Sequence, residues 1–139
     1  MNETSIGRIN SILEELKEII PDTRAIFCIN REGLVISEIG LDGLGRDAAG
    51  ELLSLVVHML GKAKGISFEM LGDPWIYAGF IGSQSYLLLG LVGDYAILGL
   101  LVDSPEDSQI NLTMEYLDAF LKYCRELAGL LEFLFEDEA

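Results

Sequence analysis

The sequence predicts an α/β protein of the α+β type, built on a five-stranded antiparallel sheet with helices on both faces. Two observations carry this prediction. The stretch from Tyr86 to Val102 consists of two apolar runs separated by Gly93-Asp94, and such a step between apolar runs is typical of a hairpin turn. Helical periodicity appears at the start, middle and end of the chain. The predicted element order is therefore α-β-β-α-β-β-β-α.

The hairpin at Gly93-Asp94 should lie in the middle of the sheet. Each of its apolar runs is about eight residues long, which is a strand length and far below the roughly 20 residues of a membrane-spanning helix. Neither run alternates apolar with polar residues, so both faces of both strands must be covered. We expect helices on each side of these strands and no membrane insertion.

Length and composition predict one domain that spans residues 1–139, because half of the residues are apolar. The net charge of −14 argues against nucleic-acid binding, which needs clustered basic residues, and against anionic membranes. It reflects either solubility or a partner with a basic patch. No signal-peptide pattern is visible, and Cys28 and Cys124 are expected to be buried free thiols. These features predict a cytoplasmic protein.

The first third of the chain predicts a helix followed by a hairpin. Thr4 or Ser5 can cap the helix and Pro21 ends it. Residues 24–30 and 34–39 form the two strands, with Gly33 in the turn and the second strand at a sheet edge. Residues 40–45 form a glycine-rich loop. The apolar stripe of the helix contains Ile6, Ile9, Leu13, Leu16 and Ile20.

The second predicted helix runs from Arg46 to about Lys62 and has too much apolar surface for one contact. At 100° per residue its apolar side chains cover an arc of roughly 200°, whereas packing on one sheet needs about 100°. Either the helix lies unusually deep in the domain, or a second chain covers it. We favour the second chain.

The segment after this helix is ambiguous, because residues 65–72 fit a short strand or a last irregular helical turn. The strand that follows, Trp75–Ile81, has no charged residue and no neighbour on its outer side. Such an edge favours pairing with a second copy of the same strand across a twofold axis. The predicted homodimer interface contains Leu52, Val56, Met59, Trp75, Ile76, Tyr77 and Phe80.

The last helix begins after Asp103, with a start signal at residues 104–107 and a competing cap at Asn111, and it runs to about Phe135. Its positions at helical spacing predict one buried face. That face contains Leu117, Phe120, Leu121, Cys124, Leu127, Leu131 and Leu134.

Two segments resemble the roadblock / dynein light chain family. Residues 20–37 combine a helix end, an apolar strand, the turn Asn30-Arg31-Glu32-Gly33 and then Leu-Val-Ile, and residues 92–98 are similar to the last hairpin of that family. The resemblance implies two helices on one sheet face and one on the other. It also implies a homodimer with second helices side by side and third strands paired.

The resemblance further implies a non-enzymatic platform that binds a small Ras-like GTPase and regulates or localises it, without a cofactor. In such complexes the surface around the paired second helices often meets the partner. The corresponding positions here are Arg46, Glu51, Ser54, His58 and Lys62.

The sequence contains only weak signals for a catalytic, nucleotide-binding or metal-binding site. There is no P-loop and no metal-ligand cluster of His and Cys, and His58 is the single histidine. Gly43-Leu44-Gly45-Arg46-Asp47-Ala48 loosely fits a dinucleotide fingerprint, but it follows a hairpin and Asp47 would repel phosphate. Glu14 and Glu15 are expected on a solvated face. Trp75, Tyr77 and Phe80 fit either the lining of a small-ligand pocket or, as we favour, packing in the core or the dimer contact. The alternative function is a small-ligand sensor of the PAS or GAF type, which needs an internal cavity.

Overall fold

The computed structural model describes residues 3–65, 77–103 and 114–138, with side chains for residues 5–62, 77–103 and 114–132. Its elements follow the predicted order, with one added 3-10 turn in the glycine-rich loop. The elements are α1 (Glu3–Ile19), β1 (Thr23–Asn30), β2 (Val35–Ile39), η1 (Leu41–Leu44), α2 (Arg46–Gly65), β3 (Tyr77–Ile81), β4 (Ser85–Val92), β5 (Ala96–Asp103) and α3 (Met114–Glu138).

The five strands form one sheet in the order β2-β1-β5-β4-β3, and every neighbouring pair is antiparallel. The predicted fold class is confirmed. The predicted central hairpin is β4–β5, in which β5 occupies the centre of the sheet and β4 the next position. Its turn uses Gly93 at φ 57°, a left-handed conformation that glycine adopts at low cost. The described part of the sheet ends in two edges, β2 and β3.

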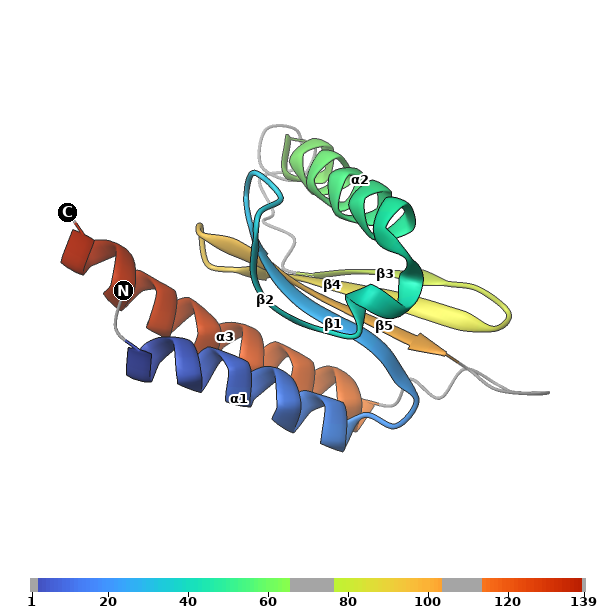
Figure 1. The fold of residues 1–139 in the computed structure, drawn as a ribbon, viewed down its shortest axis with the longest axis horizontal. Coiled ribbons are helices and arrows are strands. Elements are labelled where there is room, and N and C mark those ends of the chain that lie inside the picture. The colour runs from blue at the N-terminus through green and yellow to red at the C-terminus, as the bar shows by residue number, and fades with distance from the viewer. Residues whose placement is uncertain (1–2, 66–76, 104–113, 139) are drawn as a thin grey trace.

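The helices lie on the two faces as predicted. Figure 1 shows α1 and α3 side by side on one face of the sheet and α2 alone on the other. Each face has its own apolar core. The core under α1 and α3 includes Ile12, Leu16, Cys28 and Phe120, whereas the core under α2 is centred on Phe27, Ile29, Leu89 and Val56.

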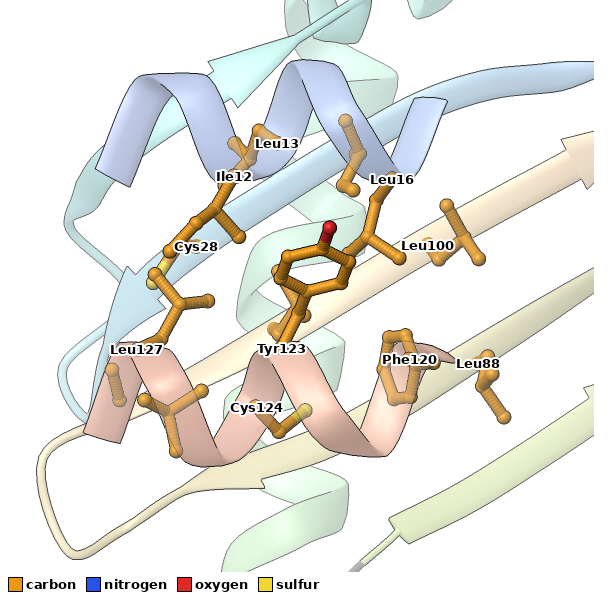
Figure 2. Close-up of a cluster of buried hydrophobic side chains, with 14 of the residues drawn as sticks. Ile12, Leu13, Leu16, Cys28, Leu88, Leu100, Phe120, Tyr123, Cys124 and Leu127 are labelled. Atoms are coloured by element: carbon orange, nitrogen blue, oxygen red, sulfur yellow. The ribbon is translucent and has the colours of Figure 1, made fainter. Parts of the chain in front are cut away.

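The close contact between α3 and the sheet depends on Gly90 of β4. A Cβ atom at Gly90 would lie 2.6 Å from Cys124 Sγ and 2.7 Å from Phe120 Cε1, so any side chain there would displace the helix. Figure 2 shows Phe120 and Cys124 on α3, within this core. Both cysteines are buried free thiols, as predicted.

Several details differ from the prediction. Helix α1 buries Ile12, which was not in the predicted stripe, and leaves Ile6 half-buried. Helix α3 buries Tyr123, which the predicted face did not include. Helix α2 includes Gly65 and so extends beyond Lys62. The ambiguous residues 66–72 and the helix-start signals at 104–107 and Asn111 lie outside the described residues.

Candidate functional site

Four of the eight large apolar side chains that are exposed in the described part of the chain lie on α2 and on the edge strand β3. Leu55 of α2 is 52% exposed, and Phe80 and Ile81 of β3 are 46% and 63% exposed. Tyr77, at the start of β3, is also exposed. Large side chains with this much exposure on two neighbouring elements indicate a contact surface rather than scattered surface residues.

The buried face of α2 is narrower than the apolar part of its surface. Val56 is the fully buried residue of the helix, and Leu52, Leu53, Val57 and Leu60 pack partly against the same core. Leu55 precedes Val56 by one residue, so its side chain points about 100° away from the buried direction. The sheet therefore accounts for only part of the apolar surface of α2.

The two flanks of α2 have different neighbours. A Cβ atom at Gly33, in the β1–β2 turn, would lie 3.4 Å from Val57 Cγ2, so the Val57 flank faces the β1–β2 hairpin. Leu55 lies on the opposite flank by helical geometry. Leu52 and Met59 are half-buried and lie between Val56 and Leu55 around the helix. The uncovered flank thus faces the side of the sheet that ends in β3.

Edge strand β3 exposes side chains on both faces of the sheet. Phe80 pairs with Leu87, which packs against the core under α2, so Phe80 lies on the α2 face. Tyr77 pairs with Gly90, the residue against which α3 packs, so Tyr77 lies on the other face. No residue of β3 is charged.

The predicted interface residues fall into three groups. Tyr77 and Phe80 are exposed, and Leu52 and Met59 are half-buried, so all four are available to a second chain. Val56 is fully buried in the core of its own chain. It is therefore a core residue, and the interface prediction for it is corrected. Trp75 and Ile76 lie outside the described residues.

The five predicted partner-binding residues are all exposed on α2: Arg46, Glu51, Ser54, His58 and Lys62. Ser54 and His58 lie opposite Val56 around the helix, on the solvent side, whereas Arg46 lies on the Val57 flank. They form a polar helix surface beside the apolar flank. Because all five side chains are exposed, they are accessible to a macromolecule.

The two cysteines are not activated as nucleophiles. Burial raises the pKa of Cys28 and of Cys124 to about 12, so both are thiols rather than nucleophilic thiolates at neutral pH. Within the described ranges, no group of three His, Cys, Asp or Glu side chains could hold a metal ion. The glycine-rich segment before α2 follows the antiparallel hairpin β1–β2 and not a βαβ unit.

One polar cluster was not predicted from the sequence. Arg8 Nη1 of α1 donates to Glu15 Oε1 at 2.9 Å, and Arg8 also binds Glu126 of α3. A hydrogen bond from Tyr123, followed by that from Arg8, lowers the pKa of Glu15. Glu15 therefore belongs to a contact between α1 and α3, although its side chain remains 41% exposed. The sequence contained one signal for this cluster: Arg8 and Glu15 are seven residues apart, which places them on the same face of a helix.

None of the helices in the described part of the chain combines the length and the apolar character that a membrane span requires. This finding covers α1, α2 and α3 within the bounds given above.

Comparisons with known proteins give matches at the level of structure. No protein-family model and no curated protein sequence matches the chain. The gliding protein MglB from Thermus thermophilus superposes with a TM-score of 0.74 at 20% identity, over 95% of this chain and 94% of that one. An MglB with a tetrameric arrangement gives 0.72 at 18% identity, over 95% and 93%.

A roadblock/LC7 domain from Streptomyces avermitilis gives a TM-score of 0.64 at 18% identity, over 91% of this chain and 97% of that one. These matches cover most of the chain, and its elements follow the order that the sequence predicted. The resemblance of residues 20–37 and 92–98 therefore extends to the whole architecture, and the chain has the fold of roadblock/LC7 domains.

Proposed function

We propose that the chain is a cytoplasmic, non-enzymatic regulator in a GTPase pathway, which forms a homodimer and binds a small Ras-like GTPase through α2. Residues 1–139 act as one roadblock-like domain without a cofactor. The observation that carries this proposal is the uncovered apolar flank of α2, next to an uncharged edge strand with exposed side chains. This combination favours a protein that works by contact with other chains.

The dimer contact follows from the chemistry of both elements. Pairing of β3 with the β3 of a second copy would satisfy the open backbone groups of each edge. It would also bring two α2 helices together along their uncovered flanks, where Leu52, Leu55 and Met59 recur at helical spacing. Such a contact repeats the same patch on both copies, as a twofold interface requires. An MglB, which has the same fold, has a tetrameric arrangement and so self-associates.

The charge of α2 supports its role as the surface that binds a partner. Helix α2 has three basic and two acidic residues, although the chain as a whole has a net charge of −14. Helices α1 and α3 have four basic and eleven acidic residues between them. Of the three helices, α2 therefore repels an acidic partner least. Arg46 and Lys62 lie on this helix.

The test is binding to the small Ras-like GTPases of the same cell, each loaded with GDP and with a non-hydrolysable GTP analogue. We expect at least one to bind, with a preference for one nucleotide state. Lys62→Glu should weaken that binding about tenfold through like-charge repulsion. The matched control is Lys17→Glu on α1, an exposed lysine on the other face of the sheet, which should leave binding unchanged.

Two results would contradict the proposal. One is the absence of binding by every GTPase of the cell in both nucleotide states. The other is equal weakening by Lys17→Glu and Lys62→Glu, which would place the contact away from α2 or show a nonspecific charge effect. Light scattering of both variants should give the wild-type mass, so that a change in binding is not a change in assembly.

A further inference from the structure

A groove lies at the other edge of the sheet, far from β3. It has a volume of about 400 Å³ and runs between α1 and the edge strand β2. Asn10 and Glu14 of α1 form one wall, and the residues of β2, Val35–Ile39, form the other. The hydroxyl of Ser37 on β2 donates to Asn10 Oδ1 on α1. This bond fixes the distance between helix and strand, so the groove is preformed.

The edge of β2 is open to a further strand. Among the described strands, β2 pairs with β1 alone, so its other side presents unpaired backbone groups. An extended peptide can bind such an edge by adding a strand, with main-chain hydrogen bonds for affinity and side-chain positions for specificity. Val35 is 46% exposed, and Ile36 and Ile39 are half-buried. Ile39 lies on the α1 face and Val35 on the α2 face, because their register partners Ile26 and Ile29 belong to the cores on those faces. An added strand would therefore find an apolar contact on each face of the sheet.

The charge of the groove selects the kind of peptide. Glu14 and Glu38 are the charged residues that line it, and no Lys or Arg is among the described lining residues. Glu38 is held in place, because its Oε2 accepts the backbone N–H of Leu41 at 3.0 Å. Glu14 lies on the α1 face of the sheet, whereas the Glu38 side chain lies on the α2 face, because its register partner Phe27 belongs to the core under α2. The open edge therefore has one carboxylate on each face, which favours a segment with basic residues.

The same charges disfavour a second copy of this chain. Pairing β2 with another β2 would bring the carboxylates of Glu14 and Glu38 close to those of the partner copy, which is unfavourable. Strand β3 has no charged residue and lacks this barrier. The two edges of the sheet therefore differ in chemistry: one is compatible with self-pairing and the other with a different, basic strand.

We propose that the groove between α1 and β2 binds an extended basic segment of a partner protein, which adds to the sheet beside β2. This site is distinct from the surface proposed for the GTPase, because β2 and β3 are opposite edges of the sheet. A dimer that pairs through β3 would have one such site at each end.

The test uses three seven-residue peptides and the full chain. The first is built from pairs of lysines and pairs of valines, so that lysines point to both faces of the sheet. The second replaces each lysine with glutamate, and the third is the first with every backbone amide methylated. We expect the lysine peptide to bind in a fluorescence anisotropy titration. The glutamate peptide should not bind. The methylated peptide should bind at least tenfold more weakly, because it retains the charge but has no backbone N–H to donate to β2.

The double variant Glu14→Gln, Glu38→Gln should weaken binding of the lysine peptide about five- to twentyfold. The amide at position 38 keeps an oxygen for the N–H of Leu41, so the loop is retained. The matched control is Glu115→Gln, Glu132→Gln, which removes the same charge from exposed positions of α3 and should change binding by less than twofold. Hydrogen exchange should show new protection of the amides of residues 35–39 when the peptide is bound.

The proposal is overturned if the methylated peptide binds as well as the lysine peptide, if both double variants weaken binding equally, or if protection appears at residues 77–81 instead of 35–39. Failure of the lysine peptide to bind at millimolar concentration overturns it as well. None of these results depends on a GTPase, so this test and the test of the proposed function fail independently.

Discussion

The ring of Phe27 lies directly against Gly99, its register partner across the β1–β5 pair. A Cβ atom at Gly99 would be 2.1 Å from Phe27 Cζ and 2.3 Å from Cε2, distances at which carbon atoms overlap. Phe27 is fully buried under α2, so the absence of a side chain on the central strand is what lets the large ring fit the core.

Gly99→Ala should therefore destabilise the protein strongly. The added methyl group displaces a buried ring in a packed core, and overpacking of this kind costs about 1–3 kcal/mol or more. Urea unfolding measures the loss. The control is Gly129→Ala on α3, where nothing lies within 4 Å of the added Cβ and the helix gains up to about 1 kcal/mol. Equal effects of the two variants would contradict this account of the core.

Tyr86 has a buried hydroxyl with no hydrogen-bond partner in the described part of the chain. Tyr86→Phe removes a polar group whose burial is costly, so the free energy of unfolding should stay the same or rise by up to about 1 kcal/mol. Urea unfolding at pH 7 checks this. A loss of more than about 1 kcal/mol would mean that the hydroxyl has a partner.

The titration of Tyr86 should make the stability of the protein fall at high pH. Burial raises the pKa of Tyr86 from 10.0 to about 12, so the unfolded chain loses the phenol proton first as the pH rises. Stability is then fully present below pH 10 and is lost as the pH rises toward 12. Wild-type protein should lose stability more steeply in this range than Tyr86→Phe, and Tyr77→Phe on exposed β3 should behave like the wild type.

The contact between α1 and α3 predicts a shift that NMR can follow. Tyr123→Phe removes the hydrogen bond that contributes most to lowering the pKa of Glu15, so the pKa of that carboxyl should rise toward its ordinary value of 4.5. Arg8→Gln should also raise the pKa of Glu15, because Arg8 lowers it both through a hydrogen bond and through its charge. Because the folded pKa is depressed, the stability that this carboxylate contributes is present at neutral pH and is lost as the pH falls below 4.5.

A carbon-13 titration of the Glu15 carboxyl measures both variants. Tyr77→Phe serves as the control, since Tyr77 lies on β3 and takes no part in the cluster. An unchanged titration in Tyr123→Phe would show that the tyrosine does not bind Glu15 in solution.

The fold could be predicted because its main signals are local. Gly93 and Gly33 both adopt positive φ, at 57° and 92°, and each closes a hairpin whose strands flank it in the sequence. The run from Ala96 to Val102 is apolar on both faces, and β5 is the strand covered from both sides at the centre of the sheet. Glycine turns and periodicity report such features without knowledge of the tertiary structure.

The site could be predicted only in part, because which side of α2 faces the sheet depends on tertiary packing and cannot be read from the sequence of the helix. Leu55 and Val56 are adjacent and both apolar, yet Leu55 is half-exposed and Val56 is fully buried. An apolar arc reveals that a helix has two contacts, but not which residue serves which contact. The groove at β2 was missed for a related reason, since Asn10 and Glu14 meet the edge strand only when α1 packs beside β2.

The self-association of the chain is tested most directly by light scattering during gel filtration, with wild-type protein and the variants Leu55→Glu and Phe80→Glu. Both variants place a carboxylate on an exposed side chain of the proposed contact, outside the folded core. The account predicts twice the chain mass for the wild type and a single-chain mass for each variant, with an unchanged circular dichroism spectrum. A wild-type protein that elutes with the mass of one chain at tens of micromolar would contradict it.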